Sequence, residues 1–191
     1  MVYEEDEETT SDVRTQEYNM VLLPTQLQDG EYVDIRLRLA NGTDYIVVSK
    51  KKVTIPTING VESANTIKID VAEDEILLMS NAIVEAYWAK GSILYATTYK
   101  EPGMQDSATA TYLPNNEVAT LINIDPNIVN IAKSALASRY ESTAGVVRGN
   151  IVNSLNEHSE DRQDNIETGV EEEINKAKEE RQSYLESLGG Y

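Results

Sequence analysis

The chain has 191 residues, a net charge of −17, no cysteine and 40% hydrophobic residues. This length fits one compact domain with appendages, and the lack of cysteine excludes disulfides and cysteine-ligated metal sites. The sequence contains no run of about 18 apolar residues, so no membrane-spanning segment is expected and the chain itself is expected to be soluble.

The negative charge is concentrated at the two ends of the chain. Residues 1–17 carry seven acids and one base (net −6), and residues 141–191 carry twelve acids and five bases (net −7), which leaves −4 for the middle. Acidic ends repel a phosphate backbone and an anionic bilayer, so nucleic acid is not expected as a partner. DNA mimicry is an alternative, but acidic ends are more often solvated. Residues 1–16 are therefore expected to form a disordered segment.

A β-rich pattern begins at residue 17. The segment from Tyr18 to Leu23 is expected to form a strand that stops at Pro24. Further along, apolar and charged residues alternate with a period of two, which is typical of a half-buried strand. The apolar positions are Ile35, Leu37 and Leu39, and the charged positions are Asp34, Arg36 and Arg38. Asn41-Gly42 then predicts a tight hairpin turn, followed by a return strand from Tyr45 to Val48.

One basic cluster accompanies this hairpin. It consists of Arg36, Arg38, Lys50, Lys51 and Lys52. These side chains are candidates for binding an acidic partner or a teichoic-type polymer. The alternative is that they form charged strand faces and a protected sheet edge without any partner. Ser49-Lys50 could be read as a catalytic dyad, but a solvent-facing lysine keeps its proton and would not activate the serine.

The same region resembles a known family. The residues that carry the resemblance are Leu23-Pro24, Asp29-Gly30-Glu31-Tyr32-Val33-Asp34-Ile35-Arg36, Asn41-Gly42, Asp44-Tyr45 and Ser49-Lys50-Lys51-Lys52-Val53. They are similar to the CpaB/RcpC proteins of Flp-type (Tad) pilus assembly, the SAF-domain family in its Gram-positive form, over about residues 1–133.

The resemblance implies a β-rich assembly factor related to β-clip (SAF) domains, without catalytic residues. It implies a location at the extracytoplasmic face of the bacterial membrane or cell envelope, with other pilus or secretion-apparatus proteins as partners. Members of the family normally carry an N-terminal membrane anchor and an upstream SAF module. Neither is found in these 191 residues, so we expect a shortened relative or part of a longer protein.

A helix is expected in the middle of the domain. After a turn at Asn59-Gly60, residues 66–71 alternate, with Ile67, Ile69 and Val71 expected to face inward. From residue 72 to 89 apolar residues instead recur every three or four positions, which predicts a helix capped by Asp70 and ended by Lys90-Gly91. Residues 92–99 return to strand composition. We therefore expect an α+β fold, a mostly antiparallel β domain with one packed helix.

Further helices follow this β-rich part. Asn116 is expected to cap a helix over 117–122, and Pro126 is expected to open another that runs to Tyr140. The domain is therefore expected to span residues 17–140.

Residues 141–191 are expected to form a long acidic helical tail. Its sparse apolar stripe includes Ile166, Val170 and Ile174, which are candidate partner-binding residues. Leu155, Ile166, Ala177 and Leu188 recur every eleven residues, a spacing that favours a right-handed supercoil. So thin a stripe does not stabilise a lone helix. The tail is thus either a device for self-association or docking on another protein, or a loosely helical segment. Gly169 should weaken the helix by about 1 kcal/mol relative to alanine.

No pattern in the sequence indicates a catalytic, cofactor-binding or metal-binding site. The lone histidine, His158, lies on a polar segment without a second ligand nearby. The expected function is that of a non-enzymatic assembly or scaffold component of a Flp/Tad-type pilus or a related secretion apparatus, acting by protein–protein docking. One alternative is a phage or cell-surface structural protein, with a β domain on an oligomeric helical stalk. Another is a hydrolase or sugar-binding enzyme.

Overall fold

The computed structural model describes residues 11–63, 65–157 and 162–189. Its strands are β1 (Val13–Tyr18), β2 (Tyr32–Arg38), β3 (Asp44–Lys52), β4 (Thr57–Ile58), β5 (Val61–Glu62), β6 (Ile67–Ala72) and β7 (Ile93–Thr98). Its helices are α1 (Glu73–Trp88), α2 (Asn116–Ile124), α3 (Asn130–Glu141), α4 (Thr143–Glu157) and α5 (Arg162–Gly189). The predicted α+β class with antiparallel strands is confirmed, whereas the relation to SAF domains stays a prediction.

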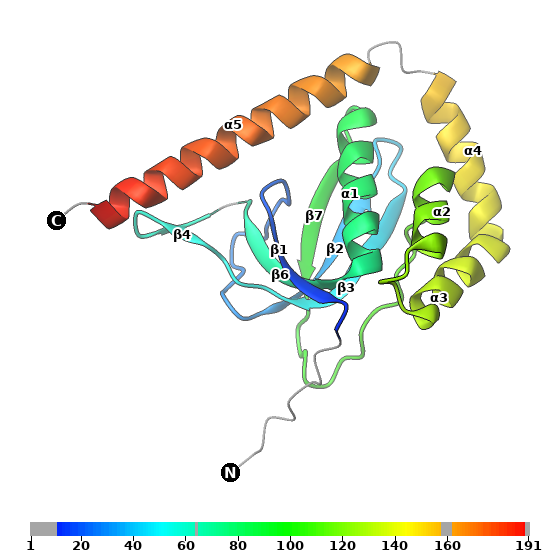
Figure 1. The fold of residues 1–191 in the computed structure, drawn as a ribbon, viewed down its shortest axis with the longest axis horizontal. Helices are drawn as coiled ribbons and strands as arrows, with labels where there is room; N and C mark the ends of the chain where they lie inside the picture. Colours follow the sequence, from blue (N-terminus) through cyan, green and yellow to red (C-terminus); the bar gives the residue numbers. More distant parts are fainter. Residues whose placement is uncertain (1–10, 64, 158–161, 190–191) are drawn as a thin grey trace.

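Five of the described strands form two sheets that are linked along both of their edges. One sheet has the order β3-β2-β7 and the other consists of β1 and β6, with every strand pair antiparallel. Single bridges join the sheets, Thr54 to Lys68 at one edge and Leu22 to Tyr95 at the other. A separate two-stranded hairpin, β4-β5, projects beyond them (Figure 1). The strands therefore wrap around a common core.

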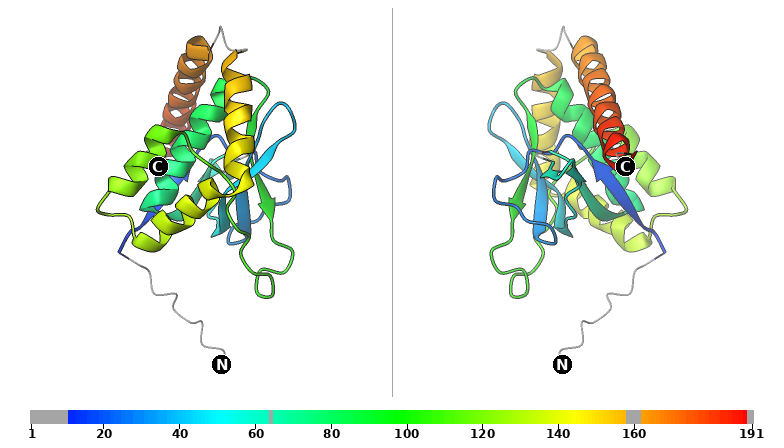
Figure 2. Two further views of the ribbon diagram at one scale, coloured as in Figure 1. Left: turned by 90° about the vertical axis from the view of Figure 1, so that its right-hand side faces the viewer. Right: turned by 90° about the vertical axis from the view of Figure 1, so that its left-hand side faces the viewer.

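Helix α1 closes this core from one side. It packs against β2, β3, β6 and β7, and it contributes Leu78, Met79 and Ala82 to the buried interior. In the view of Figure 1, α2, α3 and α4 lie on one side of α1, and α5 lies on the other. Figure 2 shows the same arrangement from two sides, with α4 in yellow and α5 in orange to red. The helices thus form an outer layer, with α1 as the one in closest contact with the sheets.

The predicted hairpin is confirmed. Ile35, Leu37 and Leu39 are all buried, and the turn has Gly42 at φ +86°, a conformation open to glycine. The amide of Leu39 donates to the carbonyl of Thr43 at 2.8 Å, which closes the turn. The inward-facing pattern of Ile67, Ile69 and Val71 in β6 is confirmed as well.

The predicted cap of α1 is wrong. Asp70 still belongs to β6, where its carboxylate accepts a hydrogen bond from Thr15 Oγ1 of β1 at 2.5 Å. The helix instead begins after Ala72, whose amide donates to Glu75 Oε2 at 2.8 Å. The cap lies two residues later than the side-chain pattern indicates, because β1 pairs with β6 up to Ala72.

The N-terminal disorder predicted for residues 1–16 is wrong for residues 13–16. These residues lie in β1, which pairs with β6 in a register that runs from Val13 opposite Ala72 to Tyr18 opposite Ile67. Strand pairing acts through the backbone, so a polar composition does not prevent it when a neighbouring strand is available. Accordingly β1 ends at Tyr18, where the sequence predicts that a strand begins. Residues 1–10 lie outside the described residues.

Two helix starts after β7 also differ from expectation. The side chain of Asn115, rather than Asn116, caps α2 by accepting from the amide of Val118 at 2.8 Å. Pro126 does not open α3, which begins at Asn130. Asp125 Oδ1 accepts from the amide of Asn127 at 2.8 Å, which folds Asp125-Pro126-Asn127 into a turn between the two helices.

Tyr18 is the buried tyrosine at the end of β1. Within the described part of the chain its hydroxyl has no hydrogen-bond partner. Burial, with a smaller contribution from the charge of Glu75, raises the pKa of Tyr18 to about 12. Its folded pKa therefore lies above the unfolded value, so its contribution to stability is present below pH 10 and is lost as the pH rises towards 12.

We expect Tyr18→Phe to change stability in two ways. At pH 8 it should raise the free energy of unfolding by about 1 kcal/mol, because an unpaired buried hydroxyl is removed. The native chain should lose about 2–3 kcal/mol between pH 10 and pH 12 through this residue, a loss that the variant avoids. Urea unfolding at pH 8 and pH 11.5 checks both effects. A variant with the same pH dependence as the native chain would contradict the assignment.

Candidate interaction surfaces

The structure places the arginines of the predicted basic cluster on the outer face of β2. Arg36 Nε donates to Asp44 Oδ1 at 2.7 Å, and Tyr95 OH donates to the other oxygen of the same carboxylate at 2.5 Å. Burial works against the charge of Arg36, but the hydrogen bond to Asp44, the charge of Asp44 and the contributions of Tyr95 together outweigh it and raise the pKa of Arg36. The guanidinium of Arg38 lies over the ring of Tyr95, 5.3 Å from its centroid. Both arginines thus have partners within the sheet.

The three lysines of the cluster point to different neighbours. Lys50 Nζ donates to the carbonyl oxygen of Gln105 at 2.7 Å, and Lys51 Nζ lies 2.5 Å from Glu75 Oε2 at the start of α1. Lys52 is exposed at the end of β3. The three lysines therefore have different surroundings, and the role of the five bases in binding a partner stays a prediction.

Asp34 organises the outer face of the sheet. It is buried, and its Oδ1 accepts hydrogen bonds from Ser49 Oγ at 2.8 Å, from the amide of Lys50 at 2.9 Å and from Tyr99 OH at 2.7 Å. Lys50 has φ +49°, at an irregularity in the pairing of β2 with β3. Tyr99 OH also accepts from the amide of Ala108 at 2.9 Å. One carboxylate oxygen thus stabilises the irregular backbone of β3 at Lys50 and, through Tyr99, anchors the loop after β7.

Ser49 and Lys50 are not arranged as a catalytic dyad, because each side chain is hydrogen-bonded to a different group. Ser49 Oγ is bonded to Asp34, and the ammonium of Lys50 is bonded to a backbone carbonyl. An activated serine needs a base that accepts its proton, and a lysine ammonium has no free lone pair. The two side chains serve the local structure of β3.

The most deeply buried polar cluster connects α4 to α1. Arg148 of α4 is 5% exposed and Glu85 of α1 is 3% exposed. Arg148 Nη1 donates to Glu85 Oε1 at 2.6 Å, and Arg148 Nη2 donates to Glu85 Oε2. Arg148 Nε reaches the carbonyl oxygen of Leu113 at 3.1 Å. Each of the three guanidinium nitrogens thus donates to an acceptor, in a fork geometry that lysine could not reproduce.

Two tyrosines complete this cluster. The guanidinium of Arg148 lies 5.2 Å from the ring centroid of Tyr45 and 5.4 Å from that of Tyr112. Tyr112 OH donates to Glu85 Oε2 at 2.8 Å, and burial followed by the charge of Glu85 raises the pKa of Tyr112 well above 10. Burial lowers the pKa of Arg148, but the hydrogen bonds to Glu85, the charge of Glu85 and the two tyrosines together outweigh it, so the net change is upward. The cluster ties α4 to the sheet and crosses the domain boundary predicted at residue 140.

The predicted acidic tail divides into α4 and α5, and α5 lies along the body of the protein. It packs against α1 and the β4 hairpin (Figure 1). Ile166, Val170 and Ile174 all belong to α5. Ile166 is half-buried, whereas Val170 is 38% and Ile174 48% exposed. Their role in binding a partner stays a prediction, and His158 lies outside the described residues.

Gly169 allows α5 to approach α1 closely. A Cβ atom at this position would lie 2.5 Å from Cδ1 of the Tyr87 ring on α1. The glycine that the sequence alone identifies as a weak point of the helix is therefore the residue that admits the aromatic ring. Close packing against α1 offsets part of the cost of glycine in a helix.

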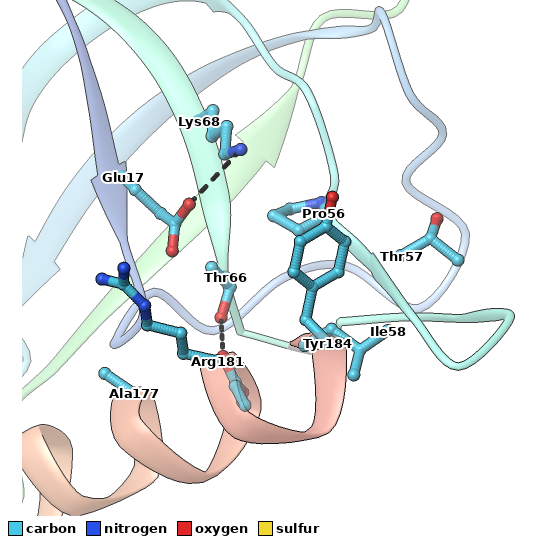
Figure 3. Close-up of a pocket in the computed structure, with 10 residues that line it drawn as sticks. Glu17, Pro56, Thr57, Ile58, Thr66, Lys68, Ala177, Arg181 and Tyr184 are labelled. Carbon is cyan, nitrogen blue, oxygen red and sulfur yellow. Dashed lines mark hydrogen bonds and ion pairs between the residues drawn. The ribbon is translucent and has the colours of Figure 1, made fainter. Parts of the chain in front are cut away.

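A groove runs between the second half of α5 and the sheets (Figure 3). It has a volume of about 520 Å³ and is lined mainly by Glu17, Thr66, Lys68, Ala177 and Tyr184, together with residues of the β4 hairpin. Lys68 Nζ lies 3.5 Å from Glu17 Oε2 across β1 and β6. Thr66 Oγ1 donates to Glu180 Oε2 of α5 at 3.1 Å. The groove thus has charged groups on its walls and an aromatic ring at one end.

A second, smaller hollow continues the groove on the other side of Ala177. It measures about 310 Å³ and is lined by Glu17, Asn19, Val170, Ile174 and Ala177. The two candidate residues Val170 and Ile174 therefore face partly empty space instead of a packed interior.

Within the described ranges, no group of three or more His, Cys, Asp or Glu side chains is positioned to hold a metal ion. Also within those ranges, no helix has both the length and the apolar character needed to cross a bilayer. Comparison with known proteins gives no family model, no curated protein and no solved structure that matches this chain.

Proposed function

We propose that this chain is a non-enzymatic assembly component that acts by docking on other proteins. The observation that carries the proposal is the apolar stripe of α5, which stays largely open although the helix lies against the body. Tyr184, Leu185 and Leu188 are 47%, 56% and 58% exposed, in addition to Val170 and Ile174. Exposed apolar side chains gathered on one element mark sites where proteins bind.

The proposed setting is a Flp/Tad-type pilus or a related secretion apparatus. Its support is the resemblance of residues 1–133 to the CpaB/RcpC proteins, carried chiefly by the β2–β3 hairpin and the residues before it. The partners would then be other proteins of that apparatus at the extracytoplasmic face of the membrane. The buried Arg148–Glu85 pair fits this role, because it fixes the position of α4 relative to α1 and the sheets.

A co-purification experiment tests the proposal. We expect the full chain to retain pilin or pilus-platform proteins when they are co-expressed, and the double variant Leu185→Glu/Leu188→Glu to lose at least about 90% of the captured material, because charge is placed in a buried contact. Leu22→Glu is the matched control. Leu22 is 58% exposed, as Leu188 is, but it pairs with Tyr95 of β7 and does not line either of the hollows beside α5.

Two outcomes would count against the proposal. If no pilus protein is retained, or if Leu22→Glu is as damaging as the double variant, docking through α5 is wrong. A stable trimer or larger oligomer without pilus proteins, measured by light scattering after size exclusion, would instead favour the structural protein with a helical stalk.

A further inference from the structure

Helix α5 fills its place on the body incompletely. Two residues with small side chains, Gly169 and Ala177, face α1 and the sheets. At Gly169 the fit is close, because the Tyr87 ring occupies the position of the missing side chain. At Ala177 it is not, because the hollows of about 520 and 310 Å³ both border this residue. The atoms that line such spaces lack contacts on one side, so the helix gives up packing energy there.

The described hydrogen bonds between the body and the second half of α5 are partly exposed. Thr66 Oγ1 donates to Glu180, and Asn59 Nδ2 donates to Ser183 Oγ at 2.5 Å. Contacts of this kind at a surface contribute little net stability, because water competes for the same groups. The N-terminal end of the helical arm is different, since Arg148 fixes α4 through a buried bidentate pair. The arm is therefore fixed at α4 by a buried ion pair, whereas the second half of α5 is held by partly exposed hydrogen bonds.

We propose that the surface formed by α1, β1, β6 and the β4 hairpin is a receptor for an amphipathic helix of a partner protein, and that α5 is a displaceable occupant of it. The inference rests on the proposed docking function and adds a second contact, on the body beneath α5, to the contact made by the exposed end of α5. Without α5, the surface presents the Tyr87 ring where Gly169 lies, and three hydrogen-bond donors further along, Asn59 Nδ2, Thr66 Oγ1 and Lys68 Nζ, where the second half of α5 lies.

These features define the chemistry of the incoming helix. It carries a glycine or another very small residue opposite Tyr87, as α5 does with Gly169. Eight residues later it carries a large aliphatic side chain, which fills the space that Ala177 leaves open. Three residues after that it carries an acidic residue, which takes the position of Glu180 beside Thr66 and Lys68. Such a helix keeps the contacts of α5 and adds those that α5 lacks.

An intramolecular helix competes with any partner for the same surface. The apparent affinity for the partner is the intrinsic affinity multiplied by the fraction of molecules in which α5 has left the surface. A change that weakens α5 without altering the receptor surface should therefore strengthen binding in trans, and this is a result that a purely structural α5 would not produce.

The test uses the full chain with Gly169→Leu, which drives a side chain into the Tyr87 ring while leucine favours the helix itself. The probes are fluorescent peptides of residues 162–189, one with the native sequence and one with Ala177→Leu. Measured by fluorescence anisotropy, the native peptide should bind the Gly169→Leu chain about tenfold or more tightly than the native chain. The Ala177→Leu peptide should bind both chains more tightly than the native peptide does.

Gly149→Leu is the matched control. Gly149 is an exposed glycine of α4 whose added Cβ would meet nothing within 4 Å, so the same substitution there should leave peptide binding at the native level. Glu180→Lys is the second variant in case Gly169→Leu does not fold, which circular dichroism would show. It removes the acceptor for Thr66 and should increase peptide binding in the same direction.

Several results would overturn the inference. One is equal binding of the native peptide to the native, Gly169→Leu and Glu180→Lys chains. Another is an Ala177→Leu peptide that binds no better than the native one. A concentration-dependent dimer of the native chain that the peptide dissociates would assign the surface to a second copy in place of a different protein. Peptide binding without capture of pilus proteins would leave this inference standing and would count only against the proposed function.

Discussion

Replacing Arg148 by methionine is expected to lower the free energy of unfolding by about 3–5 kcal/mol, the range for breaking a buried ion pair from one side. The substitution leaves the carboxylate of Glu85 buried, at 3% exposure. Of the described hydrogen bonds to this carboxylate, only the one from Tyr112 OH remains. It also removes the guanidinium from between the rings of Tyr45 and Tyr112. Urea unfolding at pH 7, followed by circular dichroism, measures the loss.

Two further variants separate the buried charge from the general effect of substitution. Lys68→Met breaks the Glu17–Lys68 pair, whose side chains are about half exposed, and should cost less than about 1 kcal/mol. Glu85→Leu combined with Arg148→Met should be more stable than Arg148→Met alone, because no unpaired charge remains. In this double variant Tyr112 OH still reaches Asn81 Oδ1 at 3.0 Å. A double variant as unstable as the single one would show that shape, and not charge, determines the loss.

The parts of the fold that the sequence predicts correctly are those encoded over short distances. The hairpin with its turn at Asn41-Gly42 and the inward face of β6 each depend on a period of two within one strand. The helix α1 follows from a change to a period near 3.6. These patterns result from burial of one face of a single element, so no knowledge of the neighbouring elements is needed to recognise them.

The Arg148–Glu85 cluster has no such local signal. Arg148 lies in a helix that the sequence predicts to belong to an acidic tail, and its partner is 63 positions away. An arginine beside valines on a polar helix is far more often solvated than buried. The sequence contains one clue to this cluster. Glu85 lies within the apolar pattern of α1, and a carboxylate buried at such a position requires a partner.

The partners of the basic cluster are not encoded locally either. Arg36, Lys50 and Lys51 belong to one hairpin, yet their partners are Asp44, the backbone at residue 105 and Glu75. Composition reports how many charges a segment carries, but the pairing of each charge depends on elements that pack from elsewhere in the chain. Gly169 illustrates the same limit. Its role in admitting the Tyr87 ring depends on the packing of α5 against α1, which the sequence of α5 alone does not indicate.

Replacing Asp34 by alanine is expected to lower the free energy of unfolding by about 3 kcal/mol, because hydrogen bonds to a charged acceptor contribute about 1.5–3 kcal/mol each and three that share one oxygen do not add fully. Ser49 Oγ, Tyr99 OH and the amide of Lys50 would all lose the same acceptor. Asp34→Asn retains an acceptor oxygen without the charge, so its loss should be roughly half as large. Urea unfolding of the three chains at pH 7 measures the series.

The position of the damage distinguishes this carboxylate from an ordinary buried group. With Asp34 removed, nothing compensates for the φ of +49° at Lys50, so the irregular turn of β3 should relax and the amides of Lys50 and Ala108 should exchange with solvent faster than those of β6. Lys50→Gly is the control, because glycine adopts this φ without strain, and it should leave both stability and exchange near the native level or slightly improve them. If Asp34→Ala accelerated exchange uniformly across all strands, the carboxylate would be a general stabiliser of the core. Acceleration confined to β3 and the loop after β7 would show that a single oxygen sets the local path of the chain on this face of the sheet.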